Sequence, residues 1–580
     1  MEQRRYEVMP ERLRCKCDAS MYSFQSTAEI PPLKGFVEQE RPVRAIRFGL
    51  DIASPGYNIY VSGLTGTGKT TVIKHFLDEI ASSLPTPDDW CYVFNFRDPN
   101  CPAVFNLPAG SARMFKNEME ELMQHLRTEI PKAFESKEYE RSMGALIQEN
   151  QERQQSLYNQ LSEKARGAGF SLELTKVGVS LVPIIHGKTI TAEQYEVLDE
   201  ATKKEIEKRR GELQQDINAF LRQVRDINRE SRDQVNGLNR KIGLYVIGTR
   251  IEGIREQFGS IQKVAAHLDD VKDHILSHLE DFTEDGQKQE SASGSQVTLE
   301  PPTDPFLKYR VNIVVDNTNL QGAPVVIETN PTYYNLFGRM ERRAQLGTLL
   351  TDFTMIRAGA CVQSNGGYLV LTANDVLLNP GVWETLKRMV KNGEVRIEDL
   401  GEQYGAVPVA GMRPSPIPVK VKVIMIGTQW IYQMLYMLDE DFRKIFKVKA
   451  DFDYEMNRTP ASLQGYAAFI SSRCYDEGLL HFDAAAVAQV VEYGARLVDD
   501  QEKLSARFSD VADIVREASF WAREAGATVV AADHVRRAVG EKHYRSNLVE
   551  ERIQQIIREG TLRVDVTGRT VGQVNGLAVI

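Results

Sequence analysis

The sequence predicts an α/β domain that is interrupted by a long helical insertion and followed by a helical C-terminal domain. Three observations lead to this prediction. A glycine-rich loop stands between a short strand and a helix within residues 57–81. Within an insertion at residues 112–285, residues 112–165 and 191–281 are rich in Glu, Gln, Lys and Arg, with apolar residues at three- and four-residue spacing. Residues 456–560 carry further amphipathic helical blocks.

Length and composition bound the class of protein. A chain of 580 residues, 42% hydrophobic and 26% charged, is a soluble globular chain with room for about three to five domains. The formal net charge is −9. Nucleic-acid-binding proteins are more often basic, so a nucleic-acid partner is not indicated, although a local basic patch is compatible with this composition.

The cysteines and the hydrophobic segments predict a cytoplasmic protein. Six cysteines are scattered without the paired spacing of a zinc site, and we expect reduced thiols: Cys15, Cys17, Cys91, Cys101, Cys361 and Cys474. The first residues, MEQRRYEVMPERLR, lack the apolar core of a signal peptide. No apolar run reaches the ~18 residues of a membrane span, so no membrane span is expected.

Residues 1–111 are interpreted as a polar lead-in and the first half of the α/β domain. Residues 35–52 place Val43, Ile46 and Leu50 at helical spacing. A strand at 57–61, the glycine-rich loop, a helix at 70–81 and a next strand at 90–96 then follow. This order is the start of an α/β nucleotide-binding unit.

The insertion is predicted to be a helical bundle or coiled-coil arm. Its longest amphipathic stripe is Leu213, Ile217, Phe220, Leu221, Val224, Ile227, Val235 and Leu238. Residues 170–183 alternate around Gly178 and predict a β-hairpin. Residues 286–304 are a polar linker without periodicity.

Strand character returns after the linker. Residues 308–317 have strand character, and 366–371 and 419–426 are apolar runs that predict buried strands, so 305–455 is assigned as the second half of the α/β domain. Residues 456–560 are assigned as a helical domain.

The strongest chemical motif is GLTGTGKT at residues 63–70, which fits GxxxxGK[ST] between a strand and a helix. A chance match in a Gly/Thr-rich turn is the alternative, and the flanking strand and helix argue against it. Backbone N–H groups of such a loop face phosphates, Lys69 neutralises the β- and γ-phosphates, and Thr70 ligates Mg²⁺. ATP and Mg²⁺ are the expected cofactors, and the expected contacts are Gly63, Leu64, Thr65, Gly66, Thr67, Gly68, Lys69, Thr70 and Thr71.

Several stretches in this order resemble the Lon-like ATP-dependent proteases. They are NFRDPNCPAVFNLPAG (95–110), NPTYYNLFGRME (330–341), IRAGACVQSNGGYLVL (356–371), WETLKRMVKNGEVRIED (383–399), DEDFRKIFKVKADFD (439–453) and GQVNGLAV (572–579). The chain looks most like the LonC-like branch, whose AAA+ region carries a long helical insertion. The resemblance implies an AAA+ P-loop domain with a helical lid at 456–560.

The resemblance places the Walker B strand at GGYLVL, where Thr372 and Ala373 stand at the positions of its Asp and Glu. In the family these acids hold Mg²⁺ and polarise the attacking water, and neither threonine nor alanine can act as that base. Asp375 serves as a displaced acid only if the strand end bends, and Glu384 is a more distant candidate. We therefore expect nucleotide binding with weakened or absent hydrolysis.

The resemblance also implies residues that sense the γ-phosphate. Thr428, with Gln429 next to it, is the candidate for sensor 1, and an ordinary polar pair after a strand is the alternative. Arg443, with Lys444 as the second choice, is the candidate arginine finger reaching a neighbouring subunit. A solvated helix charge is the alternative there.

Two further features follow from the same resemblance. Arg507 in KLSARF stands where the lid carries its sensor 2 arginine. Tyr333, Tyr334 and Phe337 are candidates for a pore loop that grips substrate, because an aromatic ring packs on any side chain. Core packing is the alternative for these aromatic residues.

Residues 561–580 resemble the first strand of a Lon-type protease domain, and we expect that the chain is a fragment of a longer protein. No Ser–Lys peptidase residues can be assigned in it. The leading hypothesis is the AAA+ module of a Lon-like serine protease, a homo-oligomeric, hexameric ring that unfolds protein substrates. The alternatives are a hydrolysis-deficient nucleotide-binding scaffold or gate, and a remodelling ATPase without a peptidase.

Overall fold

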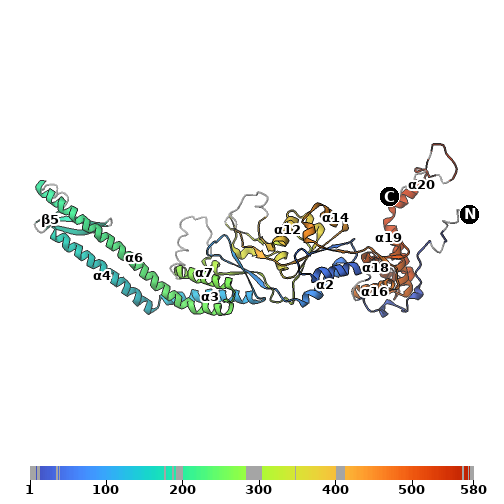
Figure 1. The fold of residues 1–580 in the computed structure, drawn as a ribbon, viewed down its shortest axis with the longest axis horizontal. Helices are drawn as coiled ribbons and strands as arrows, with labels where there is room; N and C mark the ends of the chain where they lie inside the picture. The colour runs from blue at the N-terminus through green and yellow to red at the C-terminus, as the bar shows by residue number, and fades with distance from the viewer. Residues whose placement is uncertain are drawn as a thin grey trace.

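The computed structural model describes residues 8–9, 13–33, 37, 39–175, 178–185, 188–190, 200–282, 304–345, 348–399, 412–564, 567–572 and 574. The molecule is elongated, with a helical arm, a central α/β body and a C-terminal helical bundle in that order (Figure 1). The first and last described residues lie at the bundle end, opposite the arm tip (Figure 1). The linker at 286–304, except Asp304, and most of the strand expected at 572–579 lie outside the described residues.

The central body is built on a five-stranded parallel sheet in the order β17-β1-β16-β13-β8. The strands are β1 (Ile59–Ser62), β8 (Val325–Glu328), β13 (Tyr368–Thr372), β16 (Lys422–Gly427) and β17 (Val448–Asp451). Strands β1, β13 and β16 are largely apolar because helices cover both faces of the sheet.

The strand expected at 90–96 is not part of this parallel sheet. Residues Asp89–Val93 form β2, which lies between β3 (Ala103–Leu107) and β7 (Val311–Val315) in a separate antiparallel sheet. The neighbour of β13 is instead β8, a four-residue strand that the sequence analysis did not identify. Hydrophobic pattern predicts that a segment is extended, but pairing partners depend on long-range contacts that the pattern does not encode.

Two helical layers cover the parallel sheet. On one face, α1 (Glu40–Asp51) and α2 (Lys69–Ser83) pack against apolar side chains of β1, β13 and β16. On the other face lie α12 (Val382–Asn392) and α14 (Gln429–Leu438). Lys422 closes the end of α1, because its Nζ donates to the carbonyls of Gly49, Ile52 and Tyr57. Burial lowers the pKa of this ammonium.

Shorter elements connect this body. The helices are α9 (Tyr333–Phe337), α10 (Ala360–Gln363), α11 (Ala373–Leu378) and α15 (Phe442–Ile445). The two-stranded pairs are β9 (Arg339–Met340) with β12 (Ile356–Arg357), β10 (Arg343–Gln345) with β11 (Thr348–Leu350), and β14 (Glu394–Val395) with β15 (Ile417–Pro418). The 3-10 turns are η3 (Ala19–Met21), η4 (Thr27–Glu29), η5 (Leu279–Phe282), η7 (Pro305–Tyr309) and η8 (Phe353–Met355).

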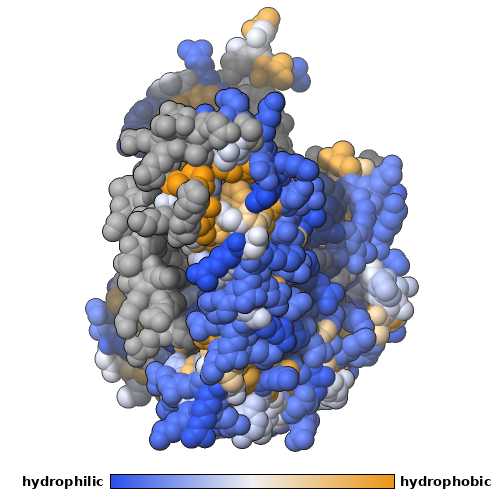
Figure 2. Space-filling model, turned by 90° about the vertical axis from the view of Figure 1, so that its left-hand side faces the viewer, coloured by the Kyte–Doolittle hydropathy of each residue, from blue (hydrophilic) through white to orange (hydrophobic). Residues whose placement is uncertain are grey.

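The arm is formed by α3 (Ser111–Phe134), α4 (Lys137–Gly167), α6 (Glu200–Phe258) and α7 (Gln262–Ser277). The tip carries β4 (Phe170–Thr175), β5 (Gly178–Ile185) and β6 (Lys188–Thr189), a small antiparallel sheet that includes the hairpin expected around Gly178. Its own small core includes Phe170, Leu172 and Leu213. Viewed from the tip, the surface is mostly hydrophilic, with an apolar area toward the top of the view (Figure 2).

The antiparallel sheet joins the arm to the body. In β2, Cys91 and Val93 face the core of the arm base, whereas Trp90 and Tyr92 belong to the core of the α/β body. Because successive side chains of a strand point to opposite faces, β2 contributes to both cores. Asn312 of β7 fixes the contact, because its buried Nδ2 donates to the carbonyls of Phe353 and Ile356.

The C-terminal bundle consists of α16 (Pro460–Glu477), α17 (Ala484–Arg496), α18 (Phe508–Glu524), α19 (Ala532–Ser546) and α20 (Leu548–Arg558), with the pair β18 (Glu455–Asn457) and β19 (Lys503–Ser505). Residues 13–33 run across it, and Ser471 Oγ donates to the carbonyls of Thr27 and Ile30. No helix among the described residues is long and apolar enough to cross a membrane.

Candidate nucleotide-binding site

The glycine-rich loop follows β1 and leads into α2, which begins at Lys69. Gly66 and Gly68 have φ values of 85° and 78°, a left-handed conformation that other residues adopt at a cost. A Cβ at Gly68 would meet no atom within 4 Å, so the space beside this glycine is open. The first N–H groups of α2 have no intrahelical acceptor and are oriented for an anion.

Lys69 is folded back into this loop. Its Nζ donates to the carbonyls of Gly63 at 2.9 Å and Leu64 at 2.5 Å, and the residue is only 9% exposed. Desolvation lowers the pKa of the ammonium. A buried cation held only by carbonyl dipoles is a good partner for a phosphate, which offers full negative charge in their place.

The residues expected around the phosphates meet at one edge of the sheet. The register pairs Ser62 of β1 with Gly427 of β16, and Ile426 with Thr372 of β13. The N–H of Gly63 donates to the carbonyl of Gly427 at 3.3 Å. The loop and Thr428 follow β1 and β16, and Thr372 is the last residue of β13, so all three lie at the carboxyl ends of adjacent strands. This is the usual ligand edge of such sheets.

The two residues expected at the Walker B positions, Thr372 and Ala373, have opposite environments. Thr372 ends β13 and is exposed, whereas Ala373 is 0% exposed and begins α11. A Cβ at Gly427 would lie 2.9 Å from the Cβ of Ala373, so the backbone of β16 packs against this residue. The chain turns into a helix here, and the half-buried Asp375 lies in its first turn.

Glu384 lies in α12 rather than at the strand edge. Its carboxylate forms an ion pair with Lys387 at 2.9 Å, and its side chain is 65% exposed. Lys387 also contacts Asp439 at 2.8 Å. Glu384 is therefore engaged on the helix surface.

Thr428 caps α14. Its Oγ1 accepts from the N–H of Ile431 at 3.3 Å, which leaves the hydroxyl proton for another acceptor. Gln429, the next residue, is exposed and lines a cavity of about 820 Å³.

This cavity lies beside the glycine-rich loop. Phe452, in its wall, is so close to Gly63 that a Cβ there would lie 2.8 Å from the Cβ of Phe452. Gln39, Arg41 and Lys503 also line it, so the start of α1 and the C-terminal bundle both contribute. Glu40, Asp451, Asp453 and Glu455 add carboxylates to the same lining.

The C-terminal bundle touches the loop directly through Ser509. The N–H of Ser509 donates to the carbonyl of Gly66 at 3.2 Å. Arg507, two residues earlier, forms an ion pair with Asp510 at 2.9 Å, and its buried Nε has no partner among the described residues. The sequence analysis did not identify Ser509, because a contact between such distant segments leaves no local pattern.

Arg443 is held against α14. Its Nε donates to the carbonyl of Tyr436 at 2.8 Å, and its guanidinium lies 4.4 Å from the centre of that ring. Both Arg443 and Lys444 are exposed, and Lys444 pairs with Asp441.

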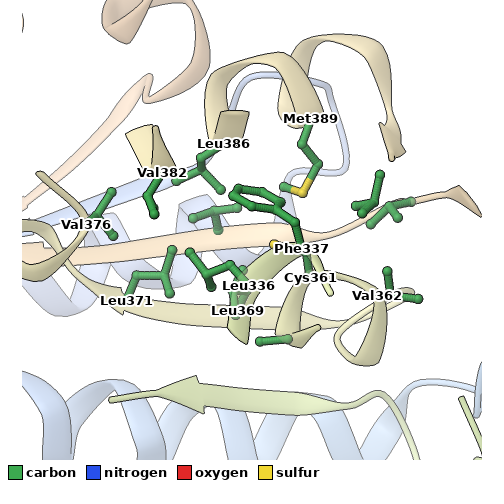
Figure 3. Close-up of a cluster of buried hydrophobic side chains, with 14 of the residues drawn as sticks. Leu336, Phe337, Cys361, Val362, Leu369, Leu371, Val376, Val382, Leu386 and Met389 are labelled. Carbon is green, nitrogen blue, oxygen red and sulfur yellow. The ribbon is translucent and has the colours of Figure 1, made fainter. Parts of the chain in front are cut away.

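The aromatic residues expected in a pore loop are divided by the structure. Tyr333 and Phe337 are 4% and 1% exposed, and Phe337 points among Leu386 and Met389 of α12 (Figure 3). The expectation that these two grip substrate is wrong for this conformation, because both rings form the core. Tyr334 remains 39% exposed, and its hydroxyl contacts Asp399 at 2.9 Å.

Three family models match parts of this chain. A LonB-like AAA domain matches residues 321–453, the lid domain of the archaeal LonB AAA+ ATPase matches 481–545, and a Lon-like LonC helical domain matches 89–122. The first match covers β8, β13, β16 and β17, and the third covers β2, β3 and the start of α3. These matches confirm the AAA+ fold with a lid and the resemblance to Lon-like proteins.

Curated relatives agree with these models. An archaeal Lon protease from Archaeoglobus fulgidus is 24% identical over 273 residues, 46% of this chain and 43% of that protein. A putative Lon protease homolog from Escherichia coli is 22% identical over 237 residues, 40% of this chain and 38% of that protein. The alignments therefore span less than half of either relative.

Similar solved structures include NtrX from Brucella abortus and a RuvB mutant from Thermotoga maritima. The NtrX structure has 16% identity and a TM-score of 0.26, covering 41% of this chain and 52% of NtrX. The RuvB structure has 13% identity and a TM-score of 0.20, covering 30% of this chain and 45% of RuvB. TM-scores this low carry no argument about the fold.

Proposed function

We propose that this chain, an AAA+ protein of the Lon-like kind, is the ATP-binding module of an ATP-dependent serine protease. In this proposal a ring of subunits unfolds protein substrates and feeds them to a Ser–Lys protease chamber outside the present sequence. The observation that carries it is the complete glycine-rich loop at the ligand edge of the sheet, with Lys69 buried in it.

The residues of the loop fit a nucleoside triphosphate. Lys69 would exchange its two carbonyl partners for β- and γ-phosphate oxygens, and the buried Nε of Arg507 would gain an acceptor. The nucleotide, with Mg²⁺ held through Thr70, supplies a phosphoanhydride bond whose cleavage drives remodelling. The cavity of about 820 Å³ beside Phe452 offers space for the base.

An exposed apolar surface on α14 supports a homo-oligomer. Trp430, Met437 and Leu438 are 71%, 67% and 80% exposed, and Arg443 is packed against the same helix. Contiguous exposed apolar side chains mark interaction surfaces more often than chance. We assign this surface and Arg443 to the contact with a neighbouring subunit of a hexameric ring, in the cytoplasm, where the six free thiols would stay reduced.

A second candidate function is a scaffold or gate that binds nucleotide without turning it over. The observation that favours it is the environment of Ala373, which is fully buried where the family places its catalytic glutamate. No carboxylate stands at either Walker B position of this chain. Bound ATP would then stabilise the domain, while phosphate release would stay at background.

Binding of ATP and ADP measured by calorimetry tests the common part of both proposals. We expect Lys69→Ala to weaken ATP binding about tenfold or more, because a charge-assisted contact to phosphate is lost. Lys74→Ala, an exposed lysine on the same helix, is the matched control and should bind as wild type does. Equal affinities in all three proteins would exclude the loop as the nucleotide site.

The rate of phosphate release from ATP separates the two candidate functions. Release by the wild type that disappears in Lys69→Ala excludes the non-hydrolysing scaffold. Background release from a protein that binds ATP tightly excludes the ATP-driven unfolding ring. Sequencing the gene beyond codon 580 tests the protease assignment, which fails if no Ser–Lys peptidase is encoded there.

A further inference from the structure

Tyr60 is a fully buried tyrosine on β1, and its hydroxyl reaches the next strand. It donates to the carbonyl of Thr428 at 3.0 Å. A Cβ at Gly427 would lie 2.1 Å from this hydroxyl, so the phenol passes directly over a glycine to make the bond. No other residue type at 427 would leave that path open.

The ring of Tyr60 packs against two other aromatic rings. It packs against Tyr432 of α14 at 5.2 Å and edge-on against Phe442 of α15 at 5.9 Å. Burial raises the pKa of this phenol far above neutrality, so it is a hydrogen-bond donor at every pH at which the protein is handled. The bond thus ties the strand before the glycine-rich loop to the start of α14.

The same construction occurs a second time. Tyr466 of α16 is fully buried, and its hydroxyl donates to the carbonyl of Ser505 at 2.5 Å. A Cβ at Gly494 would lie 2.6 Å from this hydroxyl, so this phenol also passes over a glycine. Ser505 in turn accepts the N–H of Arg507 through its Oγ at 3.1 Å.

We propose that Tyr60 and Tyr466 are positioning residues that set the two phosphate-sensing segments, Thr428 and Arg507, relative to the glycine-rich loop. Tyr60 holds the carbonyl of Thr428 itself, and Tyr466 holds the carbonyl of Ser505, two residues before Arg507. Gly427 and Gly494 make these two hydrogen bonds possible, because a side chain at either position would collide with the phenol. This inference rests on the proposed nucleotide site and names the parts of the fold that align it.

A buried phenol–carbonyl bond contributes both stability and alignment, so the test needs a control that changes stability alone. Tyr92 provides it, because this tyrosine is also 0% exposed and its hydroxyl donates to the carbonyl of Ser415 at 2.7 Å. Tyr92 lies on β2 in the antiparallel sheet, away from the strands that carry the loop. Tyr→Phe at each position removes one hydroxyl and keeps the ring.

The first readout is amide hydrogen exchange without nucleotide. We expect Tyr60→Phe to speed exchange at Ile431, whose N–H is held by Thr428, by about fivefold. Tyr466→Phe should do the same at Arg507. Tyr92→Phe should leave both segments unchanged. Unchanged exchange in Tyr60→Phe and Tyr466→Phe, or equal acceleration in all three variants, overturns the positioning role.

The second readout is the ratio of affinities for ATPγS and ADP with Mg²⁺. Tyr60→Phe and Tyr466→Phe should reduce any preference for the triphosphate by about fivefold, and Tyr92→Phe should not. A preference that is identical in wild type and both variants overturns the inference. If the wild type binds neither nucleotide, the proposed function fails, and so does the claim that the positioned segments sense phosphate. Hydrogen exchange still decides whether the two phenols position these segments.

Discussion

At the scale of single residues, Thr372 and Ala373 are neighbours in the chain but tolerate different side chains. Thr372 is exposed at the end of β13, and Ala373 is enclosed by β16 and the helical layer. A carboxylate at 372 would be solvated, whereas a carboxylate at 373 would be buried beside Gly427 and the phenol of Tyr60.

We therefore expect Ala373→Glu to lower the free energy of unfolding by about 3 kcal/mol or more, because the longer carboxylate would be placed in a fully buried, tightly packed site. Thr372→Asp should change it by less than about 0.5 kcal/mol. Chemical denaturation of the two variants measures both values. Equal stability of the variants would show that the backbone at Gly427 yields to a larger side chain.

Thr372 and Ala373 can also be replaced together to test whether acids at these positions allow ATP hydrolysis. Phosphate release by the Thr372→Asp, Ala373→Glu double variant can be interpreted only if this variant remains folded. Its denaturation midpoint is therefore measured first, and its phosphate release is then compared with that of wild type. Glu384 offers no substitute acid, because it is paired with Lys387 on the surface of α12.

At the scale of elements, the base of the arm contains histidines that the fold keeps neutral. His267 of α7 is 7% exposed and lies among the rings of Phe96 and Phe105. Desolvation lowers its pKa to about 4, and the nearby Asp270 opposes this shift. His274, stacked on His278, also has a pKa lowered to about 4, first by burial.

This arrangement predicts acid-sensitive docking of the arm. Between the ordinary pKa of about 6.5 and the folded value of about 4, the unfolded chain binds more protons than the folded one, so stability falls as the pH falls through this window. For His267 alone the loss approaches about 3 kcal/mol. Thermal unfolding followed from pH 7.5 to 4.5 checks the direction.

The control for this prediction is His267→Phe, which keeps an aromatic ring in the pocket and removes the titrating group. Its melting temperature should decline less steeply with acid than that of wild type. Parallel decline of the two curves would assign the acid sensitivity to other groups.

At the scale of the whole molecule, the arm contains two separate hydrophobic cores, one at its base and one at its tip. The base shares its core with the antiparallel sheet, whereas the tip has a small core of its own around Phe170. Between them α4 and α6 run side by side, joined by polar contacts such as Asn150 to Ser231 at 2.8 Å. The distal half therefore contributes nothing to the core of the nucleotide-binding body.

Replacing residues 151–230 with a short glycine-rich turn should leave nucleotide affinity within about twofold of wild type, because the base contacts are retained. If the arm captures protein substrate, binding of an unfolded protein such as carboxymethylated lactalbumin should be lost in this variant, as measured by fluorescence anisotropy. Unchanged anisotropy would place substrate capture elsewhere. Weakened nucleotide binding would instead show that the distal arm acts on the body.

The sequence alone determined the glycine-rich loop, the helical arm and the apolar strands, because glycine geometry, helical spacing and buried runs are properties of neighbouring residues. Tertiary structure alone decided which strands pair. It placed 89–93 in the antiparallel sheet and Val325–Glu328 in the parallel one. It also placed Tyr333 and Phe337 in the core, set Ser509 on Gly66, and buried Tyr60 over Gly427. Each of these depends on contacts between segments far apart in the chain, where burial and partner choice are properties of the whole fold.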